Sequence, residues 1–530
     1  MGERPPVRRT GRRIATTSSA LTLGLIGTLL TLAGCRPTSP PSATPSTRGD
    51  RPVRLLLVND VYSSDTLRDG SGSLARVAAW RDSVEQASGD RVLFLLAGDL
   101  FSPSLLSKWY FGAQMVEAFN ATRLDYATLG NHEFDVSREQ FTDRLRESRF
   151  PWFSANCGFG DGAPFPGVRG WDTVTVNGTR VGLFGTTVLA EYRSWVRCTD
   201  PDVAARAVLD TLERAGAELV VALTHQFIWH DSATLVREPR IHVLLGGHEH
   251  DGRRFAYDGR LLVKAASNSR TAAYVEARRR DGRWMLWDTL VQPARGWREH
   301  AATAAVTARW RDTLVRRIGA DRVVGVAPEP IDAVDSTSRG GESRFGNMVA
   351  DAYRFGTKAD VALINSGAMR FDDWLGPGPI TAHELESIFL FADETRVVTF
   401  PLTGARLREV LEHGVSQRRL GSGAYPQVSG VRFSFDARLP SGRRIVGPLR
   451  RDDGREIGDA EVVQVAFPSF PSCRGGDGYQ IPEAQTVCAR HDADPSSAPR
   501  SADLLVQHVA GMGGTIVPPP TGRVVRFDRR

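Results

Sequence analysis

Short apolar runs alternate with helix-like stretches along the first half of the chain. Between residues 53 and 296, runs such as "LLLV", "VLFLLA", "ELVVAL" and "IHVLL" are separated by segments with apolar residues at helical spacing. Continuous apolar runs are typical of strands covered on both faces, as in a parallel sheet. The alternation therefore predicts a layered α/β domain.

Each of these runs ends in a polar cluster. In chain order the clusters contain Asp60, Asp99, Asn131 with His132, His225, and His248 with His250. Any one of these residues could be a turn former, a helix cap or a core histidine. Five successive strand ends with oxygen or imidazole donors instead indicate one shared cleft, because the carboxyl ends of strands meet at one edge of an open α/β sheet.

The chain changes character near residue 297. The segment 297–319, "WREHAATAAVTARWRDTLVRRIG", has apolar positions at helical spacing and predicts a single linking helix. A chain of 530 residues is too long for one core. We therefore expect two domains, 53–296 and 320–530, joined by this helix.

The amino terminus has the layout of an export signal. An arginine-rich start is followed by an apolar segment, residues 20–32, which is too short to span a bilayer. Residues 1–35 end in "LAGC", which resembles the lipobox of bacterial lipoproteins, whose cysteine is acylated. The segment 36–52 is rich in Pro, Ser and Thr and predicts a tether. We expect an exported protein anchored by lipid at Cys35 to the periplasmic or outer face of the cell envelope; a plain signal peptide is the alternative.

Charge and cysteine content add two constraints. Five arginines and one glutamate precede Cys35, so most of the formal net charge of +6 belongs to the signal segment and gives no indication of nucleic-acid binding. The other four cysteines lack CxxC spacing, and export favours disulfides. Of the three possible pairings we favour the local one, Cys157–Cys198 and Cys473–Cys488.

The order Asp, Asp, Asn, His and His-x-His at successive strand ends resembles the calcineurin-like metallophosphoesterases. "GNHEFD" and "GGHEH" are similar to the five-prime-nucleotidase branch of that family. Beyond residue 320, "SRFGNMVADAYR", "ADVALINSGAMR", "YPQVSGVRFSFD" and "FPSCRGGDGYQ" follow in the order of the carboxyl-terminal substrate domain of bacterial five-prime-nucleotidases. The resemblance implies an N-terminal four-layer α/β/β/α metallophosphoesterase domain, a linking helix and a C-terminal α/β substrate domain.

The same resemblance implies two metal ions. Asp99 would bridge them, with Asp60 and His250 on one ion; the other ion would be bound by Asn131, His225 and His248. Phosphate ester hydrolysis needs a nucleophile at neutral pH and neutralisation of the phosphoryl oxygens, and two cations about 3.5–4 Å apart supply both. Mixed nitrogen and oxygen donors suit divalent or mixed-valence Zn, Mn, Fe or Co.

One position departs from the family pattern at the first strand, where Asp-x-His is replaced by Asp60-Val61-Tyr62. A phenol with a pKa of about 10 is a poor ligand for a divalent ion, whereas ferric iron binds a phenolate well. Tyr62 is therefore either a direct ligand or a neutral wall of the pocket. In both cases it should face the metal of Asp60, because residues two apart in an extended segment share a face.

Other residues near the metals have roles implied by the resemblance. His132 would face the scissile phosphate and either stabilise the transition state or protonate the leaving oxygen, with Asp135 orienting its ring; a helix cap is the alternative role of Asp135. Glu133 would support the site through hydrogen bonds. His230 and His242 match no family motif and are expected to be structural.

Substrate recognition is implied for the second domain. Arg370 in "NSGAMR" would bind phosphate oxygens, and Asn365 of the same motif is a further candidate. Asp477 would accept hydrogen bonds from ribose hydroxyls, and Phe470 would stack on the nucleobase.

Two departures bear on base recognition. Val428 lies in the segment that carries a second stacking phenylalanine in family members, and Asp393 replaces an asparagine near the base.

The leading hypothesis is a lipid-anchored phosphohydrolase acting on nucleoside monophosphates. A cyclic-nucleotide phosphodiesterase or a nucleotide-sugar pyrophosphatase shares the same chemistry. The alternative outside the enzymes is a catalytically weakened lipoprotein that binds nucleotides.

Overall fold

The computed structural model describes residues 51–189, 193–390, 396–416 and 422–527. The predicted signal segment with Cys35, most of the predicted tether, and Asp393 lie outside these residues. None of the helices in the described residues has an apolar stretch of membrane-spanning length.

Two sheets form the centre of the N-terminal domain. The first has the order β15 (Arg283–Val291), β14 (Ala272–Arg280), β1 (Val53–Val58), β2 (Val92–Ala97), β3 (Tyr126–Thr128), β4 (Trp152–Phe153) and β6 (Val168–Arg169). The second has the order β12 (Arg253–Tyr257), β13 (Arg260–Lys264), β11 (Val243–Gly246), β10 (Leu219–His225), β8 (Thr179–Thr187) and β7 (Trp171–Val176). Strands β1 to β4 run parallel to one another, as do β8, β10, β11 and β13.

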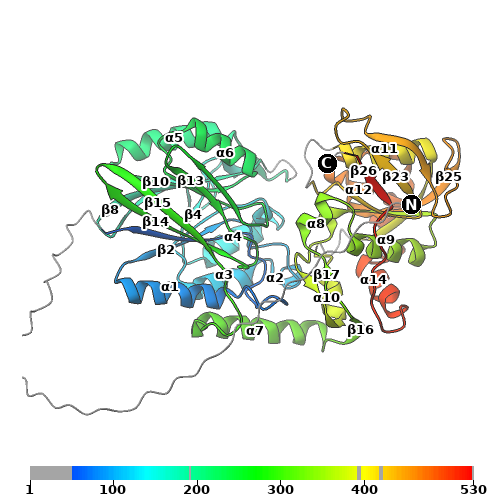
Figure 1. The fold of residues 1–530 in the computed structure, drawn as a ribbon, viewed down its shortest axis with the longest axis horizontal. Coiled ribbons are helices and arrows are strands. Elements are labelled where there is room, and N and C mark those ends of the chain that lie inside the picture. Colours follow the sequence, from blue (N-terminus) through cyan, green and yellow to red (C-terminus); the bar gives the residue numbers. More distant parts are fainter. Residues whose placement is uncertain (1–50, 190–192, 391–395, 417–421, 528–530) are drawn as a thin grey trace, which may run out of the picture. The chain divides into compact units, whose positions relative to one another are not determined.

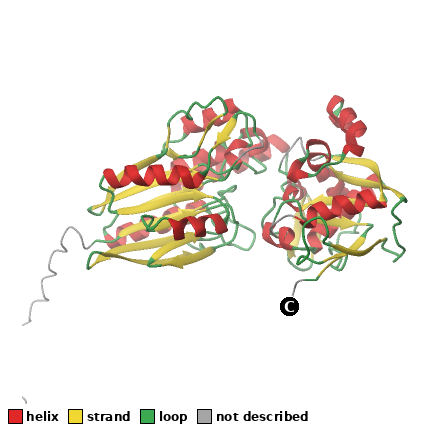
Figure 2. Ribbon diagram, turned by 90° about the horizontal axis from the view of Figure 1, so that it is seen from above, coloured by secondary structure: helices red, strands yellow, loops and turns green. Residues whose placement is uncertain are grey.

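Helices cover the outer faces of both sheets. They are α1 (Leu74–Ser88), α2 (Ser107–Tyr110), α3 (Ala113–Thr122), α4 (Arg138–Glu147), α5 (Pro201–Arg214) and α6 (Ile228–Arg237). In Figure 1, α1 and α3 lie on one side of the strand layers, with α5 and α6 on the other. Figure 2 shows the same helices and strands from above.

Side-chain alternation along β1 explains the layers. Leu55 and Leu57 belong to a fully buried cluster between the two sheets, whereas Leu56 and Val58 pack toward the helices, in a cluster that includes Leu74 of α1. Burial on both faces favours apolar residues at successive positions, as in the "LLLV" run. The predicted four-layer α/β/β/α arrangement is confirmed.

The helix α7 (Ala301–Ile318) lies within the segment predicted to link the domains, and it packs against α1 and α3. Both domains belong to one compact unit with α7.

The two disulfides are both local. The strand ribbon of β5 (Cys157–Phe159) and β9 (Val196–Cys198) is closed by the Cys157–Cys198 disulfide, and Cys473 is bonded to Cys488. The structure thus contains the favoured pairing of the three possible.

The C-terminal domain mixes helices with smaller sheets. A four-stranded sheet has the order β21 (Val397–Thr403), β25 (Val462–Pro468), β18 (Val361–Asn365) and β22 (Pro426–Ser429). The remaining strands are β16 (Val323–Ala327), β17 (Ile331–Asp332), β19 (Trp374–Leu375), β20 (Gly378–Thr381), β23 (Arg432–Phe435), β24 (Ile445–Arg450) and β26 (Val524–Arg526). The helices are α8 (Asp335–Gly340), α9 (Arg344–Thr357), α10 (Ala382–Glu386), α11 (Gly404–Ser416), α12 (Ser469–Arg474), α13 (Gln485–Ala493) and α14 (Ser501–Ala510).

Strand β18 separates two apolar cores in this domain. Leu363 packs in one core, while its neighbour Ile364 packs in the other beside Met348 of α9 and Leu505 of α14. The strand is therefore held on both faces. This support matters because β18 leads directly into the "NSGAMR" segment with Asn365 and Arg370.

Candidate functional site

The predicted metal-ligand residues all follow strands of the two central sheets. Asp60 follows β1, Asp99 follows β2, Asn131 follows β3, His225 ends β10, and His248 and His250 follow β11. Since β1, β2 and β3 are parallel in one sheet and β10 and β11 in the other, the topology delivers these residues to one place.

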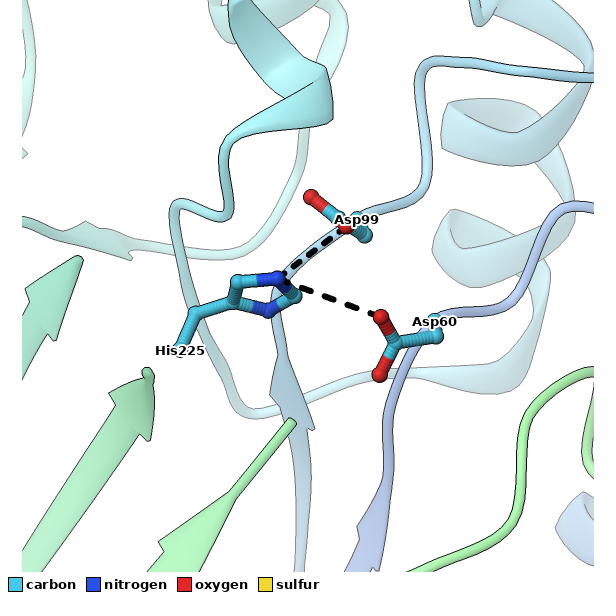
Figure 3. Close-up of side chains that lie close together, drawn as sticks. All are labelled: Asp60, Asp99 and His225. Atoms are coloured by element: carbon cyan, nitrogen blue, oxygen red, sulfur yellow. Dashed lines mark ion pairs between the residues drawn. The ribbon is translucent and has the colours of Figure 1, made fainter. Parts of the chain in front are cut away.

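The centre of the site consists of Asp60, Asp99 and His225 (Figure 3). One donor atom from each lies within 4.8 Å of the other two, and all three residues are buried. His225 Nε2 lies 3.0 Å from Asp99 Oδ2 and 3.9 Å from Asp60 Oδ1. Two carboxylates and an imidazole that converge in this way can bind a cation.

The backbone is distorted where it presents these groups. Asp60, Asp99 and His248 have φ angles of 52°, 62° and 84°, in the left-handed region that residues other than glycine rarely adopt. The turn after β3 is equally constrained, because a Cβ atom on Gly130 would lie 2.1 Å from Asp99 Oδ1. Glycine at this position lets the chain pass close to the carboxylate.

The Tyr62 hydroxyl lies among the predicted ligand atoms. It is 3.3 Å from Asp99 Oδ2, 3.3 Å from His250 Nε2 and 3.5 Å from Asp60 Oδ1. Burial raises the pKa of Tyr62 well above its ordinary value, and Asp99 and Asp60 raise it further. Both effects favour the neutral phenol over the phenolate.

His132 is held by contacts on both ring nitrogens. Its Nδ1 lies 2.6 Å from Asp135 Oδ2, and its Nε2 lies 3.1 Å from Nη2 of Arg370. Its backbone N–H donates to Asp99 Oδ1 at 2.8 Å. The alternative role of Asp135 as the cap of α4 is not observed, because Ser137 is the N-cap and forms a capping box.

Asn131 and Glu133, the two neighbours of His132 in the chain, also belong to the site. The Oδ1 atom of Asn131 lies 3.1 Å from His248 Nδ1. Glu133 accepts hydrogen bonds from the backbone N–H groups of Asp99, Leu100, Phe101 and Gly130. This one carboxylate therefore joins the loop after β2 to the loop after β3. Burial, followed by the charge of Asp99, raises the pKa of Glu133 to about 7.

Lys264 has a comparable structural role that the sequence pattern did not reveal. This fully buried side chain donates to the carbonyls of Gln226 and Gly247, and pairs with Asp231 at 2.8 Å and Glu249 at 2.6 Å. It thereby ties the end of β10 to the loop that carries His248 and His250. A signal was present: Lys264 is one of only three lysines in the chain and lies inside the apolar run "LLVKAA".

Arg370 reaches the centre of the site from the second domain. It is 7% exposed, contacts His132, and lies 3.3 Å from Asp335 Oδ2. Arg339, which sequence reasoning missed, pairs with the same Asp335 carboxylate at 2.9 Å. Its sequence context, just before Gly340 and Gly341, gives no sign of this contact.

The remaining predicted substrate residues lie together in the second domain. Asn365 Nδ2 donates to Asp477 Oδ2 at 2.6 Å. Phe470 is 37% exposed, and its ring lies against Gly476, where a Cβ atom would be 2.2 Å from the ring. An accessible aromatic face beside a polar pair can accept a planar ring.

The position of Val428 bears on base stacking. Val428 has no solvent exposure and packs in the apolar core beside β18, where it is paired with Leu363. It does not face a ligand, so a phenylalanine here would overpack the core rather than complete a stacking clamp.

His230 and His242 are structural, as expected: His230 pairs with Asp202, and His242 accepts a hydrogen bond from the backbone of Val220.

The donor set fits a transition metal cation. His225 Nδ1 lies 2.7 Å from the carbonyl of Ala97, while its buried Nε2 has no aligned hydrogen bond among the described residues. Burial alone would lower the pKa of His225, but the carboxylates of Asp99 and Asp60 raise it to about 10. The two buried carboxylates therefore favour a positive charge at this point, which either a proton on His225 or a bound cation can supply.

Comparisons with known proteins agree with this arrangement. Residues 53–252 match the family model for calcineurin-like phosphoesterases, and residues 323–484 match that for the 5'-nucleotidase C-terminal domain. Protein 5NUC of Lutzomyia longipalpis is 26% identical over 464 residues, covering 77% of this chain and 80% of the relative. The 5'-nucleotidase of Homo sapiens is 24% identical over 544 residues, covering 89% of this chain and 90% of the relative.

Solved structures show the same fold. The 5'-nucleotidase precursor from Thermus thermophilus has a TM-score of 0.77 at 22% identity, covering 91% of this chain and 100% of that one. The sulfate thiohydrolase SoxB from the same organism has a TM-score of 0.74 at 17% identity, covering 92% of this chain and 98% of that one. At these identities the likeness concerns the fold alone.

Proposed function

Because the chain belongs to the calcineurin-like phosphoesterases that carry a 5'-nucleotidase C-terminal domain, we propose that it is a two-metal phosphohydrolase that hydrolyses nucleoside 5'-monophosphates outside the cytoplasm. The observation that carries the proposal is the convergence of His132 and Arg370. These side chains come from different domains, and they meet 3.1 Å apart beside the cluster of Asp60, Asp99 and His225.

The metal centre is assigned to the residues around that cluster. Asp60, His250 and the Tyr62 hydroxyl would surround one ion, and Asn131, His225 and His248 the other, with Asp99 between them. Bound Zn, Mn, Fe or Co ions supply a water-derived nucleophile at neutral pH and offset the charge on the phosphoryl oxygens.

The chain's own groups would handle the phosphate and the leaving oxygen. Arg370 presents its guanidinium to phosphoryl oxygens, which it can bind with two parallel hydrogen bonds. His132 donates a proton from Nε2 to the oxygen whose bond to phosphorus breaks, so that the nucleoside leaves as an alcohol. Asp135 holds Nδ1 at 2.6 Å and keeps the ring in position for that transfer.

The nucleoside would be bound by the second domain. Phe470 offers an exposed ring for stacking, and Asp477, held by Asn365, accepts hydrogen bonds from ribose hydroxyls. Asp477 is in the left-handed conformation in a glycine-rich turn, with a φ of 54°. This turn presents the carboxylate on a short, constrained loop.

A substrate screen tests the proposal. Metal-loaded protein should release phosphate from adenosine 5'-monophosphate faster than it cleaves 2',3'-cyclic nucleotides or nucleotide sugars. A preference for a cyclic nucleotide would identify a cyclic-nucleotide phosphodiesterase, and a preference for a nucleotide sugar would identify a pyrophosphatase. Nucleotide binding without turnover of any substrate would identify a binding lipoprotein instead.

The proposed location rests on the signal-like segment and the disulfides. Cys157–Cys198 and Cys473–Cys488 favour an oxidising compartment. Labelling cells with a radioactive fatty acid should mark the wild-type protein and not the Cys35→Ser variant. Absence of label from the wild type would reject the lipid anchor, and equal labelling of both would reject Cys35 as its site.

A further inference from the structure

The two ring nitrogens of His250 face different domains. Nε2 faces the predicted metal centre, 3.3 Å from the Tyr62 hydroxyl and 3.6 Å from Asp60 Oδ1. Nδ1 faces the second domain, 2.9 Å from Asp372 Oδ2 and 3.7 Å from Asp335 Oδ2. The Asp372 contact has hydrogen-bond length, although the N–H does not point straight at the oxygen.

Asp372 is fixed in place by both domains. Its Oδ2 accepts a hydrogen bond from the hydroxyl of Ser267, which follows β13 in the first domain, and its Oδ1 accepts one from the backbone N–H of Asp335. The side chain is almost fully buried, and the residue has a φ of 50°. Ser267 also donates its backbone N–H to the carbonyl of His250. The carboxylate, the serine and the histidine therefore form one connected unit.

A buried carboxylate on the far nitrogen of a metal-binding imidazole has a known physical effect. It fixes the tautomer with the proton on the far nitrogen, orients the ring, and raises the basicity of the nitrogen that faces the metal. Here the carboxylate comes from a different domain than the histidine and the other predicted ligands of that ion.

We propose that Asp372 is a positioning residue that completes the metal centre across the domain boundary by holding His250 with Nε2 toward the ion. This inference rests on the metal centre of the proposed function. Its consequence is that affinity for the ion between Asp60 and His250 depends on the second domain, whereas affinity for the ion near His225 does not.

The next residue provides a matched control. Asp373 accepts hydrogen bonds from the backbone of Arg68 and from the guanidinium of Arg270, so it also joins the two domains. Among the described residues, none of its hydrogen bonds or ion pairs involves a predicted metal ligand. Asp373→Asn therefore removes the same charge and an interdomain contact without touching His250.

The experiment measures Mn²⁺ binding to full-length wild type, Asp372→Asn, Asp373→Asn and Ser267→Ala by calorimetric titration, with metal content checked by mass spectrometry. Wild type should bind two ions. Asp372→Asn should bind one ion normally and the other about 10- to 100-fold more weakly, the usual cost of losing such a partner. Ser267→Ala should weaken the same ion by a smaller factor, and Asp373→Asn should match wild type.

The inference would be overturned if Asp372→Asn bound each ion as tightly as wild type does. It would also be overturned if the substitution weakened the binding of both ions by the same factor. If circular dichroism shows that Asp372→Asn is unfolded, Ser267→Ala decides, and unchanged affinities in that variant would count against the inference. Wild type that binds no Mn²⁺ would reject the proposed function itself, and the inference with it. The two failures are therefore distinguishable.

Discussion

The Nδ1 atom of His132 lies 2.6 Å from Oδ2 of Asp135, three residues further along the chain. The short 3₁₀ turn His132–Phe134 brings the two side chains onto the same side of the backbone. Nε2 on the opposite edge of the ring is left facing Arg370. Because a guanidinium can only donate, Nε2 accepts the contact from Arg370, and the ring presents this nitrogen in one fixed direction.

Replacing His132 by Asn should separate catalysis from metal binding. We expect the rate of phosphate release to fall by about 10²–10⁴-fold, the usual contribution of a general acid. Both metal ions should remain, because none of the metal-centre donors has been changed. Steady-state kinetics and metal analysis of the same sample check this; loss of a metal ion would mean that His132 is a ligand.

Restoring the family's histidine at position 62 should strengthen metal binding. We expect Tyr62→His to bind Zn²⁺ or Mn²⁺ more tightly, because an imidazole is a better donor to a divalent ion than a neutral phenol. Competition with a chromophoric chelator measures the dissociation constant. An affinity at or below that of wild type would contradict the position assigned to this side chain.

Iron-loaded protein distinguishes the two interpretations of Tyr62. A phenolate bound to ferric iron gives a visible charge-transfer band, which Tyr62→Phe must abolish. Absence of the band from fully loaded wild type would identify Tyr62 as a neutral wall of the site.

Phe470→Ala should affect nucleotides selectively. We expect a higher KM for adenosine 5'-monophosphate, equivalent to the loss of about 1–3 kcal/mol of stacking, with little change for p-nitrophenyl phosphate. Phe355, which is 56% exposed on α9, provides a control, and Phe355→Ala should leave both KM values unchanged. Equal effects of Phe470→Ala on the two substrates would show that this ring has only a structural role.

Lys264→Met should destabilise the protein strongly. The substitution removes the buried cation that pairs with Asp231 and Glu249. Leaving these carboxylates unpaired should lower the free energy of unfolding by about 3–5 kcal/mol. The midpoint of urea denaturation should fall accordingly. Lys358→Met removes a lysine outside the buried core and should change stability by no more than about 0.5 kcal/mol; a similar shift in both variants would contradict the role of Lys264.

Much of the site was accessible from sequence because its residues follow strands. A buried parallel strand gives a continuous apolar run, and its carboxyl end has a fixed place at the sheet edge. These two facts are enough to predict that Asp60, Asp99 and His225 lie together. The two-residue alternation of an extended segment likewise places Tyr62 on the same side as Asp60.

The parts that sequence reasoning missed depend on contacts between distant segments. Asp372 meets His250 across 122 positions of the chain, and its neighbour Asp373 has the same chemistry but different partners. Nothing local distinguishes the two. Val428 shows the same limit: its segment is similar to one that carries a stacking phenylalanine in family members, whereas packing against β18 places this side chain in the core.

Under the proposed function, hydrolysis depends on metal ions shared through Asp99. The most direct test measures phosphate release from adenosine 5'-monophosphate by wild type and Asp99→Asn, after chelation and again after addition of Mn²⁺, Zn²⁺ or Co²⁺. We predict that chelated wild type is inactive and regains activity with metal, while Asp99→Asn binds neither ion and stays inactive. Full activity of chelated wild type with no metal detectable, or of Asp99→Asn, would show that hydrolysis does not depend on these ions.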